Sequence, residues 1–128
     1  MRSLARECVF KYIFSRLFNP GDEGLFDVLC KDLNDEDKSF ASQLLCAVDN
    51  NEEAYMKKIN ELGSVSSACK LHRADLCALL LGMAELDNFP NTPVPVVIDE
   101  AVNIVAKYST ESSTDFVNGV LAEYAKEK

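Results

Sequence analysis

The feature that most constrains the fold of this chain is the spacing of its apolar residues, which recur at helical intervals in almost every segment. Residues 3–18 are apolar on nearly every side from Cys8 onward, and a helix of that kind has to be packed on every side. Proline and glycine are few and fall mostly between such segments. No stretch alternates apolar and polar residues beside hairpin turn chemistry. The sequence therefore predicts an all-α fold.

Seven helices are expected, joined by short loops, near residues 3–18, 22–33, 35–48, 51–62, 66–86, 95–108 and 112–124. Residues that favour helix ends are predicted at Asp22, at Asn34 or Asp35, at Asp49-Asn50-Asn51, at Gly63 and at a serine or threonine among residues 112–114. Pro95 suits a first helical turn, where its missing N–H is not needed. The chain is expected to form one domain, 1–128, with an N-terminal lobe of about 1–62 and a C-terminal lobe of about 63–128 built around the apolar fifth helix.

The composition is that of a globular protein, since 48% of the 128 residues are hydrophobic and 27% are charged. The longest uncharged apolar run, Leu76 to Ala84, is about half of the ~20 residues that a membrane-spanning helix requires. Glu7 and Lys11 interrupt the stretch in which a secretion signal would be apolar. Five cysteines without a CxxC pair are expected to be reduced, buried thiols. We therefore expect a cytoplasmic protein without a membrane span.

Side chains that could carry catalysis or hold a metal are sparse. The only histidine is His72, next to Arg73 and near Asp75, and no serine or cysteine has a sequence context that marks it as its partner. Neighbouring carboxylates such as Glu52 and Glu53 point about 100° apart on a helix and do not share a site. The glycines fit no phosphate-binding loop, and the cysteine spacings fit no zinc template. We expect no catalytic residue, no metal and no cofactor.

Positive charge is concentrated at the N-terminal end. The whole chain has a formal net charge of −8, which argues against a broad basic face for nucleic acid. Residues 1–18 nevertheless hold four cations against Glu7 alone, a net charge of +3, so the remaining residues carry −11. Arg2 and Arg6 lie one helical turn apart, and we expect these first turns to protrude and meet phosphate. The alternative is that they only keep a buried helix soluble.

The C-terminal third resembles a known family. Residues 93–121, PVPVVIDEAVNIVAKYSTESSTDFVNGVL, resemble the C-terminal signature of the NusB transcription antitermination family. Ala5-Arg6-Glu7-Cys8 is similar to the opening helix of that family, and Glu85-Leu86 to the end of its central helix. The resemblance implies an all-helical protein of two small bundles. It also implies that the protein binds the boxA element of ribosomal RNA leader transcripts together with the ribosomal protein NusE, and helps to load antitermination factors on RNA polymerase.

The resemblance further implies which residues meet these partners. RNA contacts are carried over to the basic first helix and to the region before FVNGVL, which gives Arg2, Arg6, Ser112, Ser113, Thr114 and Phe116. Glu85, at the end of the central helix, is carried over as the residue that contacts the protein partner.

Physical chemistry supports some of these contacts and leaves others open. A helix N-terminus with exposed hydroxyl groups can hold phosphate, and an accessible phenylalanine can stack on an unpaired base. Phe116 and Val120 also fit an apolar stripe, so that core packing of Phe116 stays open. Asn118 and Gly119 are expected to be structural, with the small Gly119 allowing close approach of a second helix.

The chain also departs from the family pattern. The family's N-terminal arm usually carries several more cations, and Asp115 stands where a cation often precedes the phenylalanine. On the central helix, Leu76, Leu80 and Ala84 stand where relatives often have arginine, arginine and tyrosine. Each lost cation removes roughly one phosphate's worth of counterion release. We therefore expect weak RNA binding by the isolated protein and useful affinity only beside a basic partner.

Two other classes of function are considered. A protein-interaction module or homo-oligomer could use the apolar fifth helix without binding RNA, and the oligomeric state stays open. The same helical fold also occurs as the N-terminal domain of ribosomal RNA cytosine methyltransferases. A chain ending at Lys128 is expected to lack room for their catalytic domain. We therefore expect a non-enzymatic adaptor.

Overall fold

The computed structural model describes residues 2–18, 24–62 and 72–127, and this part of the chain is helical with no strand. Its helices are α1 (Arg2–Arg16), α2 (Leu25–Cys30), α3 (Asp35–Leu62), α4 (Arg73–Asn88), α5 (Val94–Tyr108) and α6 (Glu111–Lys126). The expected all-α fold is thus confirmed, with six helices in the described residues instead of about seven. None of these helices is long and apolar enough to cross a membrane.

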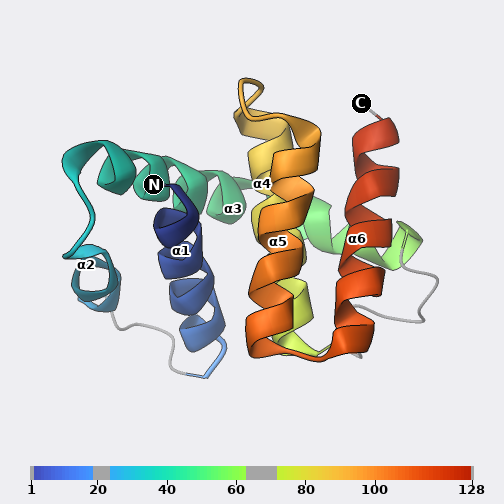
Figure 1. Ribbon diagram of the computed structural model, residues 1–128, viewed down its shortest axis with the longest axis horizontal. Coiled ribbons are helices and arrows are strands. Elements are labelled where there is room, and N and C mark those ends of the chain that lie inside the picture. The colour runs from blue at the N-terminus through green and yellow to red at the C-terminus, as the bar shows by residue number, and fades with distance from the viewer. Residues whose placement is uncertain (1, 19–23, 63–71, 128) are drawn as a thin grey trace.

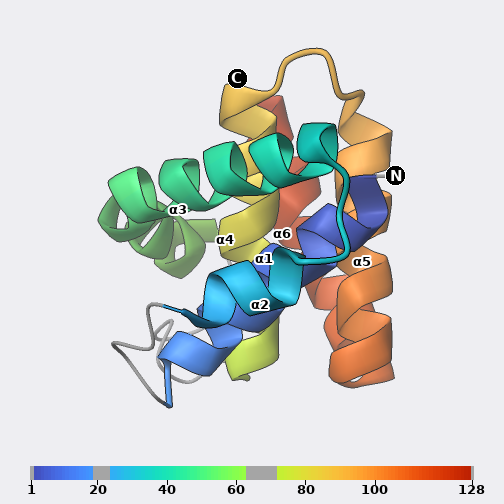
Figure 2. The same ribbon diagram turned by 90° about the vertical axis from the view of Figure 1, so that its left-hand side faces the viewer.

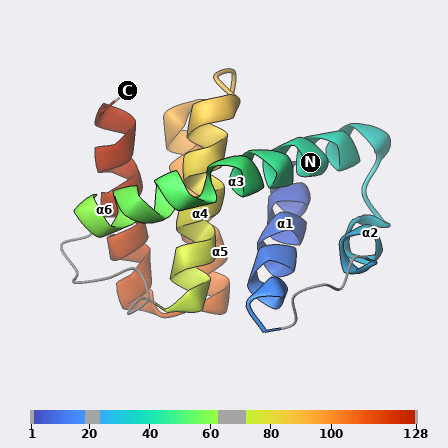
Figure 3. The ribbon, with the colours of Figure 1, turned by 180° about the vertical axis from the view of Figure 1, so that it is seen from behind.

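The third and fourth predicted helices are one continuous helix, α3, which runs across α4 (Figure 3). The prediction of a break at Asp49-Asn50-Asn51 is wrong because neither proline nor glycine occurs there and the polar side chains are bonded elsewhere. The Asn51 amide donates to the Ala47 carbonyl at 2.9 Å, one turn back along the same helix. Asp49 pairs with Arg16 of α1, Oδ1 to Nη2, at 2.7 Å. These side chains therefore do not compete with the helical hydrogen bonds.

Helix α4 is the centre of the molecule. It contacts α1, α3, α5 and α6, and every side chain from Cys77 to Glu85 is buried. In Figures 1 and 3, α1 and α2 lie on one side of α4 and α6 on the other. The buried apolar residues form one cluster to which all six helices contribute. Helix α4 is the fifth predicted helix, and it lies at the centre of all the described helices, whereas the division into two lobes stays a prediction. The predicted start of this helix at residues 66–67 lies outside the described residues.

Burial along α1 differs from the expected pattern. Ala5 and Arg6 are buried, whereas Leu17 and Phe18, just past the end of α1, are 43% and 60% exposed. The expectation that the first two turns protrude holds for the first turn, where Arg2 and Leu4 are exposed, and is wrong for the second turn. The second turn is buried because Arg6 contacts Glu85 of α4, Glu100 of α5 and the ring of Phe40 on α3.

Side-chain caps begin α3 and α6, and a proline lies in the first turn of α5. The Asn34 side chain accepts a hydrogen bond from the Asp37 amide at 2.7 Å, as expected for the start of α3. Pro95 lies in the first turn of α5, also as expected. The cap of α6 is Thr110, whose hydroxyl accepts from the Ser113 amide, so the prediction of a cap among residues 112–114 is wrong by at least two residues. Asp22 and Gly63 lie outside the described residues.

A glycine does allow close helix approach, but it is Gly82 and not Gly119. A Cβ atom on Gly82 of α4 would lie 2.8 Å from a Cδ atom of the buried Leu121 on α6. A Cβ atom on Gly119 would meet nothing within 4 Å. The structural role expected for Gly119 is therefore wrong, since its exposed position faces open space.

Candidate nucleic-acid interface

Arg6 lies at the centre of a buried ion-pair network that joins three helices. Its Nε and Nη2 atoms donate to the two carboxylate oxygens of Glu85 on α4, at 2.7 and 2.6 Å. Its Nη1 atom lies 3.4 Å from Glu100 of α5. Arg6 is 4% exposed and Glu85 is 1% exposed. Neither side chain is open to a ligand in this structure, so the exposure that the predicted roles of Arg6 and Glu85 require is not found.

This network places the N-terminal turn of α1. The bidentate contact fixes the guanidinium plane as well as its position. The neighbouring Ser3 hydroxyl donates to Glu100 at 2.6 Å, which adds a second link between α1 and α5. Arg6, Glu85 and Glu100 therefore act as positioning residues that hold the first turn of α1 against α4 and α5.

Arg2 is the exposed arginine of the pair predicted to meet RNA. Its guanidinium carbon lies 4.5 Å from the ring centroid of Phe40 on α3, and the Arg6 guanidinium lies 5.3 Å from the same centroid. Stacking on an aromatic ring orients a guanidinium without neutralising its charge. Arg2 thus offers an oriented positive charge to a phosphate group.

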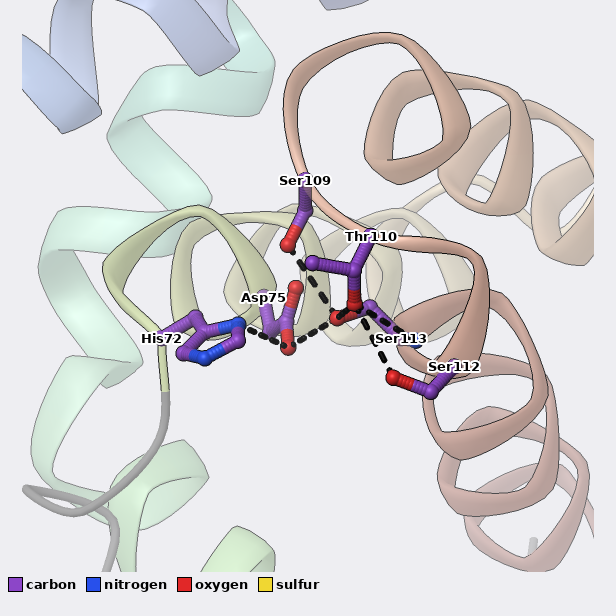
Figure 4. Close-up of polar contacts among 6 residues, drawn as sticks. All are labelled: His72, Asp75, Ser109, Thr110, Ser112 and Ser113. Carbon is purple, nitrogen blue, oxygen red and sulfur yellow. Dashed lines mark hydrogen bonds and ion pairs between the residues drawn. The ribbon is translucent and has the colours of Figure 1, made fainter.

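The predicted residues Ser112, Ser113 and Thr114 lie in the first turn of α6, and Figure 4 shows the first two of them. Ser112 is exposed, and its hydroxyl lies 3.0 Å from that of Thr110. Ser113 is buried and donates to Asp75 of α4 at 2.7 Å. The Thr114 hydroxyl donates to the Glu111 carbonyl at 2.6 Å. Of these three predicted residues, Ser112 is therefore the one best placed to meet a ligand, while Ser113 has a structural contact.

His72, Asp75 and Ser113 form a cluster that is not arranged for nucleophilic catalysis. The His72 Nδ1 atom lies 3.7 Å from the same Asp75 oxygen that accepts from Ser113. A catalytic triad needs the histidine between the hydroxyl and the carboxylate, whereas here the carboxylate lies between the other two (Figure 4). The contact of Asp75 with Ser113 instead ties the start of α4 to the start of α6. No group of three or more metal-ligating side chains occurs in residues 2–18, 24–62 and 72–127.

Phe116 is partly buried and packs against the hydrophobic core. This position agrees with the apolar stripe that it forms with Val120 and leaves part of the ring accessible. Phe116 therefore packs against the core, as one of the two alternatives predicted, while its contact with RNA stays a prediction.

Lys107 and Tyr108 of α5 are further candidates, and both lie within the run that resembles the family signature. The side chain of Lys107 is 62% exposed, and Tyr108 is 39% exposed with its ring stacked on Phe10 at 5.3 Å between centroids. Both donate to the same oxygen of Glu7 on α1, at 2.6 and 2.7 Å. The sequence signal that could have identified these two residues is a Lys-Tyr pair directly after the apolar stripe of the helix. The helical pattern alone does not show that their side chains contact Glu7 of α1.

We call five candidate residues the α1–α5 strip: Arg2, Glu7, Lys107, Tyr108 and Ser112. Glu7 of α1 contacts Lys107 and Tyr108 of α5, Arg2 lies at the N-terminal end of α1, and Ser112 lies in the first turn of α6. The N-terminal end of α1 lies beside the first half of α5, whereas α6 begins at the other end of α5 (Figures 1 and 2). The contacts of Ser3 with Glu100 and of Glu7 with Lys107 show that α1 follows α5 between these ends. An extended ligand could follow this strip.

Comparison with known proteins shows which family the chain matches. A family model described as the NusB family matches residues 3–126. A relative named transcription antitermination protein NusB, from Methylacidiphilum infernorum, is 34% identical and the match covers 98% of this chain and 91% of the relative.

Solved structures agree. T. maritima NusB superposes with a TM-score of 0.92 at 30% identity, covering 99% of this chain and 92% of that one. A structure of the antitermination factors NusB and NusE in complex with double-stranded RNA gives a TM-score of 0.88 at 26% identity, covering 99% and 97%. With its helical architecture and its sequence signature both matched over nearly the whole length, this chain belongs to the NusB family of transcription antitermination proteins.

Proposed function

We propose that this protein binds boxA-type RNA of ribosomal RNA leader transcripts together with NusE and helps to assemble the antitermination complex on RNA polymerase. The observation that carries the proposal is the α1–α5 strip, which combines an oriented cation, an exposed aromatic ring and an exposed serine at the start of α6. The similarity to a NusB chain crystallised with NusE and RNA supports it.

Each part of the strip fits a part of single-stranded RNA. Arg2 meets a phosphate group with its guanidinium, which the Phe40 ring orients. Tyr108 and the accessible part of Phe116 stack on unpaired bases. The Ser112 hydroxyl at the start of α6 donates to a second phosphate, in the first turn where the helix dipole is positive. Phosphate contacts supply most of the affinity, and base contacts supply the sequence preference.

The charge of the protein supports a need for a basic partner. Four of the 13 cations lie in the first 18 residues, and one of these four, Arg6, is buried in an ion pair. Lys107 is exposed but forms an ion pair with Glu7. A basic protein such as NusE would dock on the acidic remainder of the surface and add the cations that the strip lacks.

The alternative of a homo-oligomer rests on the apolar residues of the fifth predicted helix, and those from Cys77 to Ala84 are buried within the chain. The apolar residues of α4 are covered by α1, α3, α5 and α6 of the same chain. They therefore do not offer an apolar face to a second copy.

Arg2→Ala tests the proposed function. We expect it to weaken binding of a boxA RNA oligonucleotide to the complex with NusE by about three- to tenfold, because one phosphate contact is lost. The slope of log K against log salt should fall by roughly 0.7, the value for one contact on a single strand. Fluorescence anisotropy titrations at several salt concentrations measure both quantities.

Lys126→Ala is the matched control, since Lys126 is an exposed cation on α6 whose ion pair with Glu123 is 3.4 Å long. Like Arg2→Ala, it removes one positive charge, but at a position outside the α1–α5 strip. Equal losses for Arg2→Ala and Lys126→Ala would show that only net charge matters and would remove the strip from the RNA site.

A further inference from the structure

Glu7 is the one acidic side chain of the α1–α5 strip as defined above, and it contacts both Lys107 and Tyr108. Its side chain is 16% exposed. A single oxygen, Oε1, accepts from both the Lys107 ammonium at 2.6 Å and the Tyr108 hydroxyl at 2.7 Å. The two α5 residues that face the strip with a cation and an aromatic ring are thus both bonded to one carboxylate.

The carboxylate is ionised at neutral pH. The hydrogen bonds from Lys107 and Tyr108 hold the pKa of Glu7 below its usual value, and the positive charges of Lys107 and Lys11 act in the same direction. The same contact with Glu7 raises the pKa of Lys107, so the pair carries one full negative and one full positive charge. The protonated Lys107 is therefore already paired with a carboxylate before any ligand binds.

We propose that Glu7 is an internal competitor for RNA phosphate at Lys107, and that it thereby lowers the RNA affinity of the isolated protein. This inference rests on the proposed RNA-binding function. A phosphate group that approaches Lys107 has to displace or share the contact with the Glu7 carboxylate, and it meets the negative charge of Glu7 beside it. A lysine that already has a carboxylate partner also adds little to counterion release.

The geometry allows the exchange. Most of the Lys107 side chain is exposed, so its ammonium group can turn from Glu7 to a phosphate without any change in the backbone. Tyr108 remains in place because its ring is stacked on Phe10. Glu7 therefore sets how much of the Lys107 charge is available, while the aromatic part of the strip is held independently.

Glu7→Gln is the test, because glutamine keeps an oxygen that can accept from Tyr108 but removes the charge. We expect the isolated variant to bind a boxA RNA oligonucleotide about three- to tenfold more tightly than the wild type, measured by fluorescence anisotropy. The slope of log K against log salt should steepen by roughly 0.7, as one more cation becomes available to the single strand. In a Lys107→Met background, the same Glu7→Gln change should leave the slope unaltered.

Glu123→Gln is the matched control. Glu123 is an exposed glutamate paired with Lys126 on α6, and the substitution removes the same charge outside the strip. It should change RNA affinity less than twofold. Thermal unfolding of each variant verifies that the fold is kept.

The outcomes separate the inference from the function on which it rests. If the wild type binds RNA with NusE present but Glu7→Gln binds no more tightly than wild type or Glu123→Gln, the competitor role of Glu7 is overturned and the proposed function stands. A steeper slope in the Lys107→Met background also overturns it, because the released cation would not be Lys107. If neither wild type nor variant binds boxA RNA even with NusE, the proposed function falls and the inference falls with it.

Discussion

Replacing Glu85 with alanine is expected to lower the free energy of unfolding by about 3–5 kcal/mol, the usual cost of leaving one member of a buried ion pair without its partner. Arg6 is 4% exposed and makes two hydrogen bonds to Glu85, so the substitution leaves a buried guanidinium with only the longer contact to Glu100. Urea unfolding followed by far-ultraviolet circular dichroism at neutral pH measures the change.

Asp49→Ala is the matched control for this prediction. Asp49 of α3 pairs with Arg16 of α1 at 2.7 Å, so this pair also ties α1 to a neighbouring helix, but the Asp49 side chain is 43% exposed. The loss should be below about 1 kcal/mol, because water and salt screen an exposed pair. If Glu85→Ala and Asp49→Ala cost the same, the account of Arg6 as the residue that positions α1 is contradicted.

The network also changes how the N-terminal helix should be probed. A charge reversal at Arg6 would place a third carboxylate beside Glu85 and Glu100 in a buried site. Loss of RNA binding in such a variant would report loss of the fold. Arg2, which is exposed and outside the buried network, tests the RNA contact without that ambiguity.

Gly82→Val is expected to cost about 1–3 kcal/mol, the usual penalty for overpacking a core. The first added carbon would lie 2.8 Å from one Cδ atom and 3.0 Å from the other Cδ atom of Leu121, which is fully buried and has little room to move. The helices α4 and α6 must then separate or Leu121 must leave its rotamer. Urea unfolding again measures the loss.

Gly119→Ala is the contrasting substitution. Its Cβ atom would meet nothing within 4 Å, and alanine loses less backbone entropy than glycine on forming a helix. We expect a gain of about 0.5–1 kcal/mol. A loss at position 119 as large as the loss at position 82 would show that the packing of α6 differs from this description.

Local patterns predicted most of the fold. The apolar stripes and the placement of proline gave the all-α class, the central position of α4 and the start of α5, since these depend on residues near one another in the chain. The break expected within α3 was wrong because the Asn51 side chain bonds to its own helix and Asp49 bonds to Arg16. A polar stretch indicates a helix end only when its side chains have no such partners.

The candidate site was predicted in part, and the errors concern contacts between distant residues. Residues 93–121 contain Lys107, Tyr108, Ser112 and Phe116, and the resemblance of this run directed attention to the C-terminal end of α5 and the start of α6. That Arg6 is buried follows from Glu85 and Glu100, which are 79 and 94 positions away along the chain. The helical pattern around Arg6 could not show those partners. The same holds for Gly82, whose neighbour Leu121 belongs to another helix.

The shortage of free cations in this protein is expected to make its proposed RNA binding depend on a basic partner. The most direct measurement is an anisotropy titration of a boxA RNA oligonucleotide, near 0.1 M salt, with the protein alone, with NusE alone and with both. We predict weak binding for each protein alone and binding at least about tenfold tighter for the pair, as added phosphate contacts require. Tight binding by the isolated protein, or no gain when NusE is added, would contradict the account.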